Sequence, residues 1–500
     1  MRFLPLVLAL AGIRAWAAVG QQATAVPKTW DEQALATLEV PAPIREFSPR
    51  AVTADYYYRM PVRPIYKGYP VYAPGKEPSG YLEMLQQRQP EVVWDGDAIK
   101  PRLETESDWV KAGELVFDAA IFYDAVTTVA DVRNRRWYET IQPPLTPDGI
   151  LPFTTYVIRE QGHVELGNNA CRFCHTRVLP DGTPVKGAQG NFPFDRAAAF
   201  NPARRSIDDL RRGFRALFGA PWLKDDDPAA RVETMTMEEI LGKFNAIPGG
   251  VAGRHRASAD APPAIPDLIG IRERRYLDKT GLVRHRDVGD LMRYAALNNE
   301  LDCLSRFGDF IPSGKDFREL PDPADPDAGG RYSDEQLYAL ARYLYSLEPP
   351  SNPNRSSAFT ARGERVFRSE GCAACHTPPL FTNNKLIPAD GFIVPGNPQP
   401  DDILRRSLGT DPTLTLKTRR GTGYYKVPSL KGVWYRGPFE HNGSVATLED
   451  WFDPGRLKSG YVPTAFKPSG VKTRAVKGHE CGLRLVEEDK RALIAFLKTL

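Results

Sequence analysis

The residue types with the clearest chemistry are two thiols and an imidazole that recur in one short frame. Cysteines at positions i and i+3 project from the same side of a short helix, so both sulfurs can reach the two vinyl groups on one edge of a porphyrin. The histidine that follows can then ligate the iron. The spacing therefore predicts two covalently bound haem c groups. The two frames are Cys171-Arg-Phe-Cys174-His175 and Cys372-Ala-Ala-Cys375-His376.

Two other chemistries fit these cysteine pairs less well. A zinc ribbon also uses two such pairs, but its pairs usually lie closer together than the 201 residues between Cys171 and Cys372. A thioredoxin-like dithiol is disfavoured because histidine follows each pair at once and no βαβ pattern surrounds either one. The other cysteines, Cys303 and Cys481, form either a disulfide or two buried thiols, and the sequence leaves both open.

The segments around the two frames repeat, which indicates two similar domains. Ile265-Pro-Asp-Leu-Ile-Gly-Ile271 and Val427-Pro-Ser-Leu-Lys-Gly-Val433 are separated by a constant offset of 162 residues, and the same offset relates Arg274 to Arg436. A shared order of several motifs without a gap is better explained by duplication than by chance similarity between helical proteins.

Amphipathic helices are predicted around each repeat. The related strings Ala112–Phe117 and Ala361–Phe367 lie ahead of the two frames, and Gly363 permits the second of them to approach a neighbouring helix closely. Closing helices are predicted after Ser333 and from about Glu487 to Leu500, because leucines recur there at helical spacing. The proline-rich linker 348–353 then separates a first domain, 107–350, from a second, 354–500.

The remaining segments predict export and an N-terminal extension. Residues 1–17 have the apolar run Phe3–Ile13 and a small-residue cleavage site at Ala17, as in a signal peptide. Residues 18–106 are rich in proline and tyrosine and are predicted to wrap the body with few regular elements. The net charge of +4 gives no concentrated basic face for nucleic acid, and no later segment is long and apolar enough to span a membrane. We expect a periplasmic or secreted bacterial protein.

Residues 107–500 resemble the bacterial di-haem cytochrome c peroxidase superfamily, which includes MauG-type enzymes and di-haem rubber oxygenases. The resemblance is most specific at Val427–Ser444 and Thr447–Asp450. It implies a mainly α fold with two cytochrome c-like haem domains and extensive loops. It also implies one reactive haem, one haem that relays electrons, and a bound Ca2+ ion. The implied partners are peroxide or dioxygen and an electron donor, which is a small protein or a small-molecule reductant.

The sequence departs from this pattern at the sixth ligand of the second iron. Typical members place a methionine beyond the conserved block and MauG-like members a tyrosine, but Trp451–Gly455 contains neither, and the chain has no methionine after Met292. The candidates are His479, His441 and, more distantly, Tyr461 or a lysine. The stretch around His479 resembles the rubber-oxygenase-like branch, whose second haem takes two histidines, so His479 is our prediction and His441 the second choice. Ligation by two imidazoles lowers the haem reduction potential relative to ligation by methionine and histidine, and it leaves no open coordination position on the iron.

The first haem has no single predicted sixth ligand, which agrees with an open site for peroxide or dioxygen. The chain length per haem favours an enzyme over the alternative of a pure electron-transfer cytochrome or a haem sensor, although no catalytic side chain is identified. The candidate ligands are His163, His255, His285, Met235, Met237 and Met292. The resemblance also implies a tryptophan between the haems, for which the candidates are Trp94, Trp109, Trp137, Trp222, Trp434 and Trp451.

Overall fold

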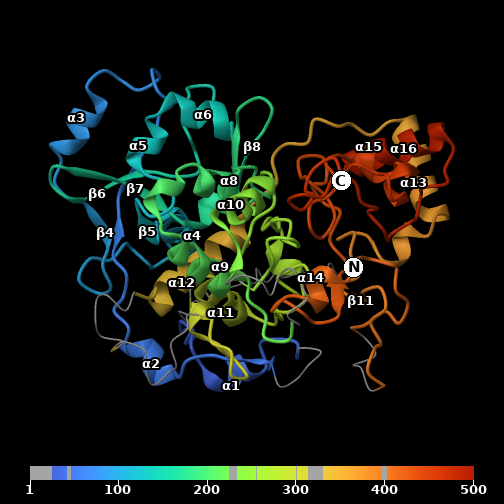
Figure 1. The fold of residues 1–500 in the computed structure, drawn as a ribbon, viewed down its shortest axis with the longest axis horizontal. Coiled ribbons are helices and arrows are strands. Elements are labelled where there is room, and N and C mark those ends of the chain that lie inside the picture. Colours follow the sequence, from blue (N-terminus) through green and yellow to red (C-terminus); the bar gives the residue numbers. More distant parts are fainter. Residues whose placement is uncertain are drawn as a thin grey trace, which may run out of the picture.

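The computed structural model describes residues 25–41, 47–223, 234–254, 256–299, 301–312, 322, 330–396 and 402–500. Figure 1 shows the chain up to about residue 350 on one side and the orange and red second half on the other. The predicted signal peptide, residues 1–17, and His255 lie outside the described residues.

The first half is built on the helix pair α4 (Glu106–Asp118) and α12 (Asp334–Ser346). Each begins with a capping box, Thr105 with Asp108 and Ser333 with Gln336, which satisfies backbone N–H groups at the helix start. The two helices touch at Gly113, where a Cβ atom would meet the backbone carbonyl of Ala339. The lack of a side chain at this position is what lets α4 lie against α12.

The second half repeats this arrangement with α13 (Ala358–Ser369) and α16 (Glu487–Lys498), which lie together in Figure 1. Here a Cβ atom at Gly363 would meet the carbonyl of Ala492. The close approach predicted for Gly363 is therefore present, and Phe367 beside it is buried. The closing helix ends at Lys498, near the expected position.

The prediction of a mainly α fold holds only in part, because the structure is mixed. A four-stranded antiparallel sheet has the order β3-β6-β7-β5, and four further sheets have two strands each among the described residues. β6 and β7 form a hairpin around a two-residue turn, and the apolar run Tyr156–Ile158 of β6 is buried, a strand that the helical prediction overlooked. The strands of this sheet are β3 (Gly68–Tyr69), β5 (Phe122–Tyr123), β6 (Tyr156–Glu160) and β7 (His163–Asn168).

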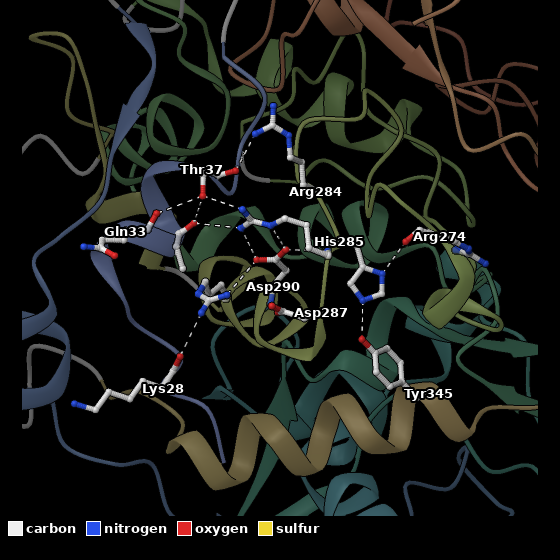
Figure 2. Close-up of polar contacts among 12 residues, drawn as sticks. Lys28, Gln33, Thr37, Arg274, Arg284, His285, Asp287, Asp290 and Tyr345 are labelled. Carbon is white, nitrogen blue, oxygen red and sulfur yellow. Dashed lines mark hydrogen bonds and ion pairs between the residues drawn. The ribbon is translucent and has the colours of Figure 1, made fainter. Parts of the chain in front are cut away.

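The described part of the N-terminal extension runs along the first half. Trp30 and Tyr57 stack with ring centres 4.7 Å apart and lie in the same hydrophobic core as α4 and α12. Figure 2 shows the segment from Lys28 to Thr37 in polar contact with the start of α11 (Val288–Asn298). The elements of the extension are α1 (Glu32–Ala36), α2 (Ala54–Arg59), α3 (Tyr81–Gln86), β1 (Pro49–Arg50), β2 (Ile65–Tyr66) and β4 (Val92–Trp94).

The other elements are short, as the high proline and glycine content predicts. The helices are α5 (Val129–Val132), α6 (Arg135–Ile141), α7 (Cys171–Cys174), α8 (Phe194–Ala199), α9 (Ile207–Phe218), α10 (Met237–Ala246), α14 (Thr413–Leu416) and α15 (Leu448–Trp451). The strands are β8 (Thr176–Val178), β9 (Pro184–Lys186), β10 (Arg306–Phe307), β11 (Leu386–Pro388) and β12 (Tyr424–Lys426). In the part of the chain that the structure describes, no helix has both the length and the apolar character needed to cross a bilayer.

Candidate haem sites

The first cysteine frame forms the short helix α7, and His175 follows directly as its C-cap. The backbone N–H of His175 donates to the carbonyl of Cys171 at 3.0 Å, which closes the turn and brings the imidazole close to the two sulfurs. The Nδ1 atom of His175 lies 3.1 Å from the carbonyl oxygen of Pro266. Because a carbonyl only accepts, Nδ1 carries the proton and Nε2 keeps its lone pair for a metal.

The second frame repeats this geometry on a 3-10 helix, Cys372–Ala374. The N–H of His376 donates to the carbonyl of Cys372 at 2.8 Å, and its Nδ1 lies 3.1 Å from the carbonyls of both Pro428 and Phe381. Pro266 and Pro428 are equivalent positions of the repeat. The sequence repeat located these loops, but it did not reveal that their carbonyls orient the two histidines.

An arginine from the same repeat fixes each of these loops. Arg274 donates to the carbonyls of Asp267 and Ile269, and Arg436 donates to the carbonyl of Ser429 at 2.7 Å. Arg274 and Arg436 are again related by the repeat. The repeated segment therefore supports the histidine of each frame, and groups that hold a histidine in this way set the orientation and basicity of its ring when it binds a metal.

The surroundings of both histidines keep the imidazoles neutral. Burial, together with the nearby Arg254 guanidinium, lowers the pKa of His175 to about 3. Burial likewise lowers the pKa of His376 to about 4, with a contribution from His479. A neutral imidazole is the form that binds metal, so both side chains fit the iron of a haem.

A cavity of about 420 Å³ opens at the first frame and is lined by Cys171, Cys174 and His175. Its size lies within the range of small-molecule and cofactor sites, and its apolar walls with a few polar groups suit a porphyrin. The polar lining includes Asp195, Arg254 and Tyr294. Burial raises the pKa of Asp195 to about 7, and one of its carboxylate oxygens accepts the N–H of Gly253 at 3.0 Å.

None of the five described candidates for a sixth ligand of the first iron lines this cavity. His163 is an exposed strand residue beside Glu160. Both ring nitrogens of His285 are already engaged, because Nδ1 donates to the carbonyl of Arg274 and Nε2 accepts from the Tyr345 hydroxyl, each at 2.7 Å (Figure 2). The methionines Met235, Met237 and Met292 pack into hydrophobic clusters.

At the second frame, the imidazole of His479 faces that of His376. The rings of His376 and His479 have centres 6.1 Å apart. Metal–imidazole nitrogen distances are about 2 Å, so two rings on opposite sides of one iron have centres about 6 Å apart. The Nδ1 atom of His479 is also buried without a hydrogen-bond partner among the described residues, the kind of unsatisfied group that an absent ligand leaves. These two side chains fit a haem between them.

Arg456, which sequence reasoning missed, holds His479 in this position. Its side chain is fully buried and donates to the carbonyls of Trp451, Val476, Gly478 and His479 at 2.6–3.0 Å. Its hydrogen bonds go only to backbone oxygens, and its guanidinium lies over the Trp451 ring, 5.2 Å from the ring centre, so no charged partner marks the interaction in the sequence. The signal that could have identified Arg456 is its place directly after Trp451–Gly455, the segment without a ligand.

His441, the second choice, is placed elsewhere. Its Nδ1 lies 2.7 Å from the Glu440 carboxylate, its ring lies 4.7 Å from that of Tyr425, and its carbonyl accepts the N–H of Ala264 from the first half. These contacts place His441 at the boundary between the halves.

The remaining predicted residues are spread over the structure. Cys303 and Cys481 do not form a disulfide, and both are partly buried. Of the predicted tryptophans, Trp434 packs with Tyr435 and first-half residues such as Ile269. The ring of Trp451 lies 5.3 Å from that of His479, and Trp222 donates to the carbonyl of Leu416. The hydrophobic cores of the first half contain Trp94, Trp109 and Trp137. No group of three or more His, Cys, Asp or Glu that could hold a metal ion occurs in the described ranges, so the structure does not gather the cysteine pairs into a zinc ribbon. The Ca2+ ion stays a prediction.

Comparisons with known proteins support the predicted resemblance. The cytochrome-c peroxidase IdrP1 of Denitromonas iodatirespirans is 29% identical over 29% of this chain and 40% of its own. The methylamine utilization protein MauG of Methylorubrum extorquens is 28% identical over 34% of this chain and 44% of its own. Both matches therefore span less than half of the relative's length. No protein-family model matches the chain.

Among solved structures, a MauG-like protein associated with microbial copper homeostasis aligns with 59% of this chain and 87% of its own. The identity is 19% and the TM-score 0.28, and this likeness is too distant to carry an argument. The sequence matches confirm that the chain resembles the di-haem cytochrome c peroxidase superfamily.

Proposed function

Starting from this resemblance, we propose that the chain is an exported di-haem c-type cytochrome with oxidoreductase activity. Cys171, Cys174 and His175 hold the first haem, and peroxide or dioxygen reacts at this site. Cys372, Cys375 and His376 hold the second haem, with His479 as the sixth ligand, and this site relays electrons. Bound haem supplies the redox-active iron at both sites.

The observation that carries this proposal is that His376 faces a second imidazole, whereas His175 faces none among the described residues. At the second frame an imidazole stands across from His376 at a separation that fits one iron. At the first frame the cysteines and His175 themselves line a cavity, and none of the described sixth-ligand candidates lines it. A six-coordinate iron suits electron transfer, whereas an iron that reacts with an oxidant needs an open coordination position.

The residues of the first cavity have separable roles. Pro266 holds the proton on Nδ1 of His175 and so directs the other nitrogen at the metal. Asp195 can hold or release a proton near neutral pH, because burial raises its pKa to about 7, and groups with such values serve well as acids and bases. Arg254 donates to Asn298 and lies 4.0 Å from Sγ of Cys174, where it places a fixed positive charge beside the cofactor edge.

The proposal includes the partners and the compartment. The electron donor is a small protein or a small-molecule reductant, in line with relatives named cytochrome-c peroxidase. Export to the periplasm or beyond rests on the signal-peptide pattern of residues 1–17.

The test uses the full chain, matured with its haems. We expect two haems per chain by mass, with cyanide and carbon monoxide binding to one of them. Separate incubations with peroxide plus an electron donor, and with dioxygen plus candidate substrates, then identify the oxidant. Two low-spin haems that ignore added ligands in both redox states support the alternative of a pure electron carrier.

A further inference from the structure

The two histidine-supporting loops meet at the boundary between the halves. Pro266 and Asp267 from the first half, and Pro428, Ser429 and Arg436 from the second, line one small cavity of about 30 Å³, which has room for about one water molecule. The carbonyls of Pro266 and Pro428, which accept from the two iron-binding histidines, therefore belong to residues around a single buried space.

Of the ion pairs that cross this boundary, the one between Asp267 and Arg436 joins the two loops. A carboxylate oxygen of Asp267 lies 3.9 Å from Nη1 of Arg436 and accepts the hydroxyl of Tyr435 at 2.8 Å. The Asp267 side chain is 3% exposed and that of Arg436 13%, so water screens this pair much less than a surface pair.

These contacts form a continuous path between the two imidazoles. His175 donates to Pro266, and Asp267 is the next residue in the chain. Arg436 pairs with Asp267 and donates to the carbonyl of Ser429. Ser429 directly follows Pro428, whose carbonyl is one of the two that accept from His376, the other being that of Phe381. The charge on either iron acts on its imidazole N–H, and a buried ion pair carries such an effect further than exposed groups do.

We propose that Asp267 and Arg436 are positioning residues that couple the two iron-binding histidines, so that the redox state of one haem shifts the reduction potential of the other. This inference rests on the proposed function, because it requires a haem at each frame. It adds a route between the sites on the side of the cysteine-linked histidines.

The repeat supplies a matched control for this coupling. Arg274 is the equivalent of Arg436, but its hydrogen bonds stay within the first half, at Asp267 and Ile269, and His285 holds its backbone carbonyl (Figure 2). A second control is the pair of Lys431 and Glu273, which also crosses between the halves but is 51% exposed on both sides. Substitutions at Arg274 and at Lys431 therefore distinguish the effect of the buried Asp267–Arg436 pair from the effects of losing a hydrogen bond within one loop or an exposed ion pair.

The experiment is a spectroelectrochemical titration of the full haem-loaded chain, in which the spin-state bands distinguish the two haems. Asp267→Asn is expected to change the reduction equilibrium of both haems at least tenfold, which is about 59 mV for one electron. Arg274→Gln is expected to shift the first haem alone, and Lys431→Gln neither. Arg436→Lys, which keeps the charge, is expected to retain most of the coupling.

The outcomes distinguish the two proposals. Fewer than two haems in the unmodified chain overturns the proposed function and this inference with it. Two haems with an Asp267→Asn shift confined to one of them, or no larger than that of Lys431→Gln, overturns the inference alone. If Asp267→Asn does not fold, full retention of the coupling in Arg436→Gln overturns it.

Discussion

In both halves of the chain, a helix pair in contact at a glycine supports a loop whose proline carbonyl orients a histidine. The surroundings of that histidine differ between the halves. In the first half the histidine lines a cavity together with Asp195 and Arg254, and in the second half it faces His479. Under the proposed function, the repeated part would hold the cofactor, and the unrepeated part would decide whether another molecule can reach it. Four changes test this comparison, from the largest expected effect to the smallest.

Replacing both cysteines of one frame is expected to remove one haem and leave the other. Cys171→Ala with Cys174→Ala eliminates both thioether links at the first site, while Cys372 and Cys375 keep theirs. Intact mass is expected to fall from two added haems to one, with loss of cyanide binding. The reverse pair of changes at the second frame keeps cyanide binding. An unchanged mass in either double variant contradicts the assignment.

His479→Ala is expected to make the second site resemble the first. Removing one of two opposed imidazoles leaves the iron with an open position, so the second haem changes from low-spin to high-spin and binds cyanide. His441→Ala is the matched control, because His441 contacts Glu440 and Tyr425. The absorption spectrum decides, and a low-spin second haem in His479→Ala shows that another residue is the ligand.

Gly363→Ala is expected to loosen the second half alone. A methyl group there meets the carbonyl of Ala492, and overpacking of this kind costs roughly 3 kcal/mol. Denaturant unfolding followed at each haem is expected to show an earlier transition for the second haem. Gly113→Ala makes the same change against Ala339 in the first half and is expected to reverse the order. Equal effects on both haems mean that the halves unfold as one unit.

Asp195→Asn is expected to remove a pH dependence that only the first site has. The folded-state pKa of about 7 lies above the ordinary value near 4, so this carboxyl favours folding at low pH, and its contribution is lost as pH rises towards 7 and above. Relative to the unmodified chain, the variant is expected to gain roughly 2 kcal/mol between pH 5 and pH 8. Urea unfolding at both pH values measures this, and a pH-independent difference contradicts the assignment.

Residue types and spacing predicted those parts of the molecule whose chemistry resides in side chains. The cysteine frames, the repeat with Arg274 and Arg436, and the glycine contact of the second helix pair all have a direct trace in the sequence. The carbonyls of Pro266 and Pro428 have none as acceptors, because every residue carries the same backbone group. The mixed fold was missed for a related reason, since short strands such as β1 depend on partners that are distant in the chain, here β10.

The connection between iron-binding histidine and supporting proline has different lengths in the two halves. It spans 91 residues from His175 to Pro266 and 52 from His376 to Pro428. The longer connection contains α8, α9 and α10 and contributes wall residues such as Asp195, Leu217 and Phe244. Under the proposed function, changes in this longer connection would reshape the cavity without altering the frame that would hold the haem, so substrate preference could diverge while cofactor attachment is retained.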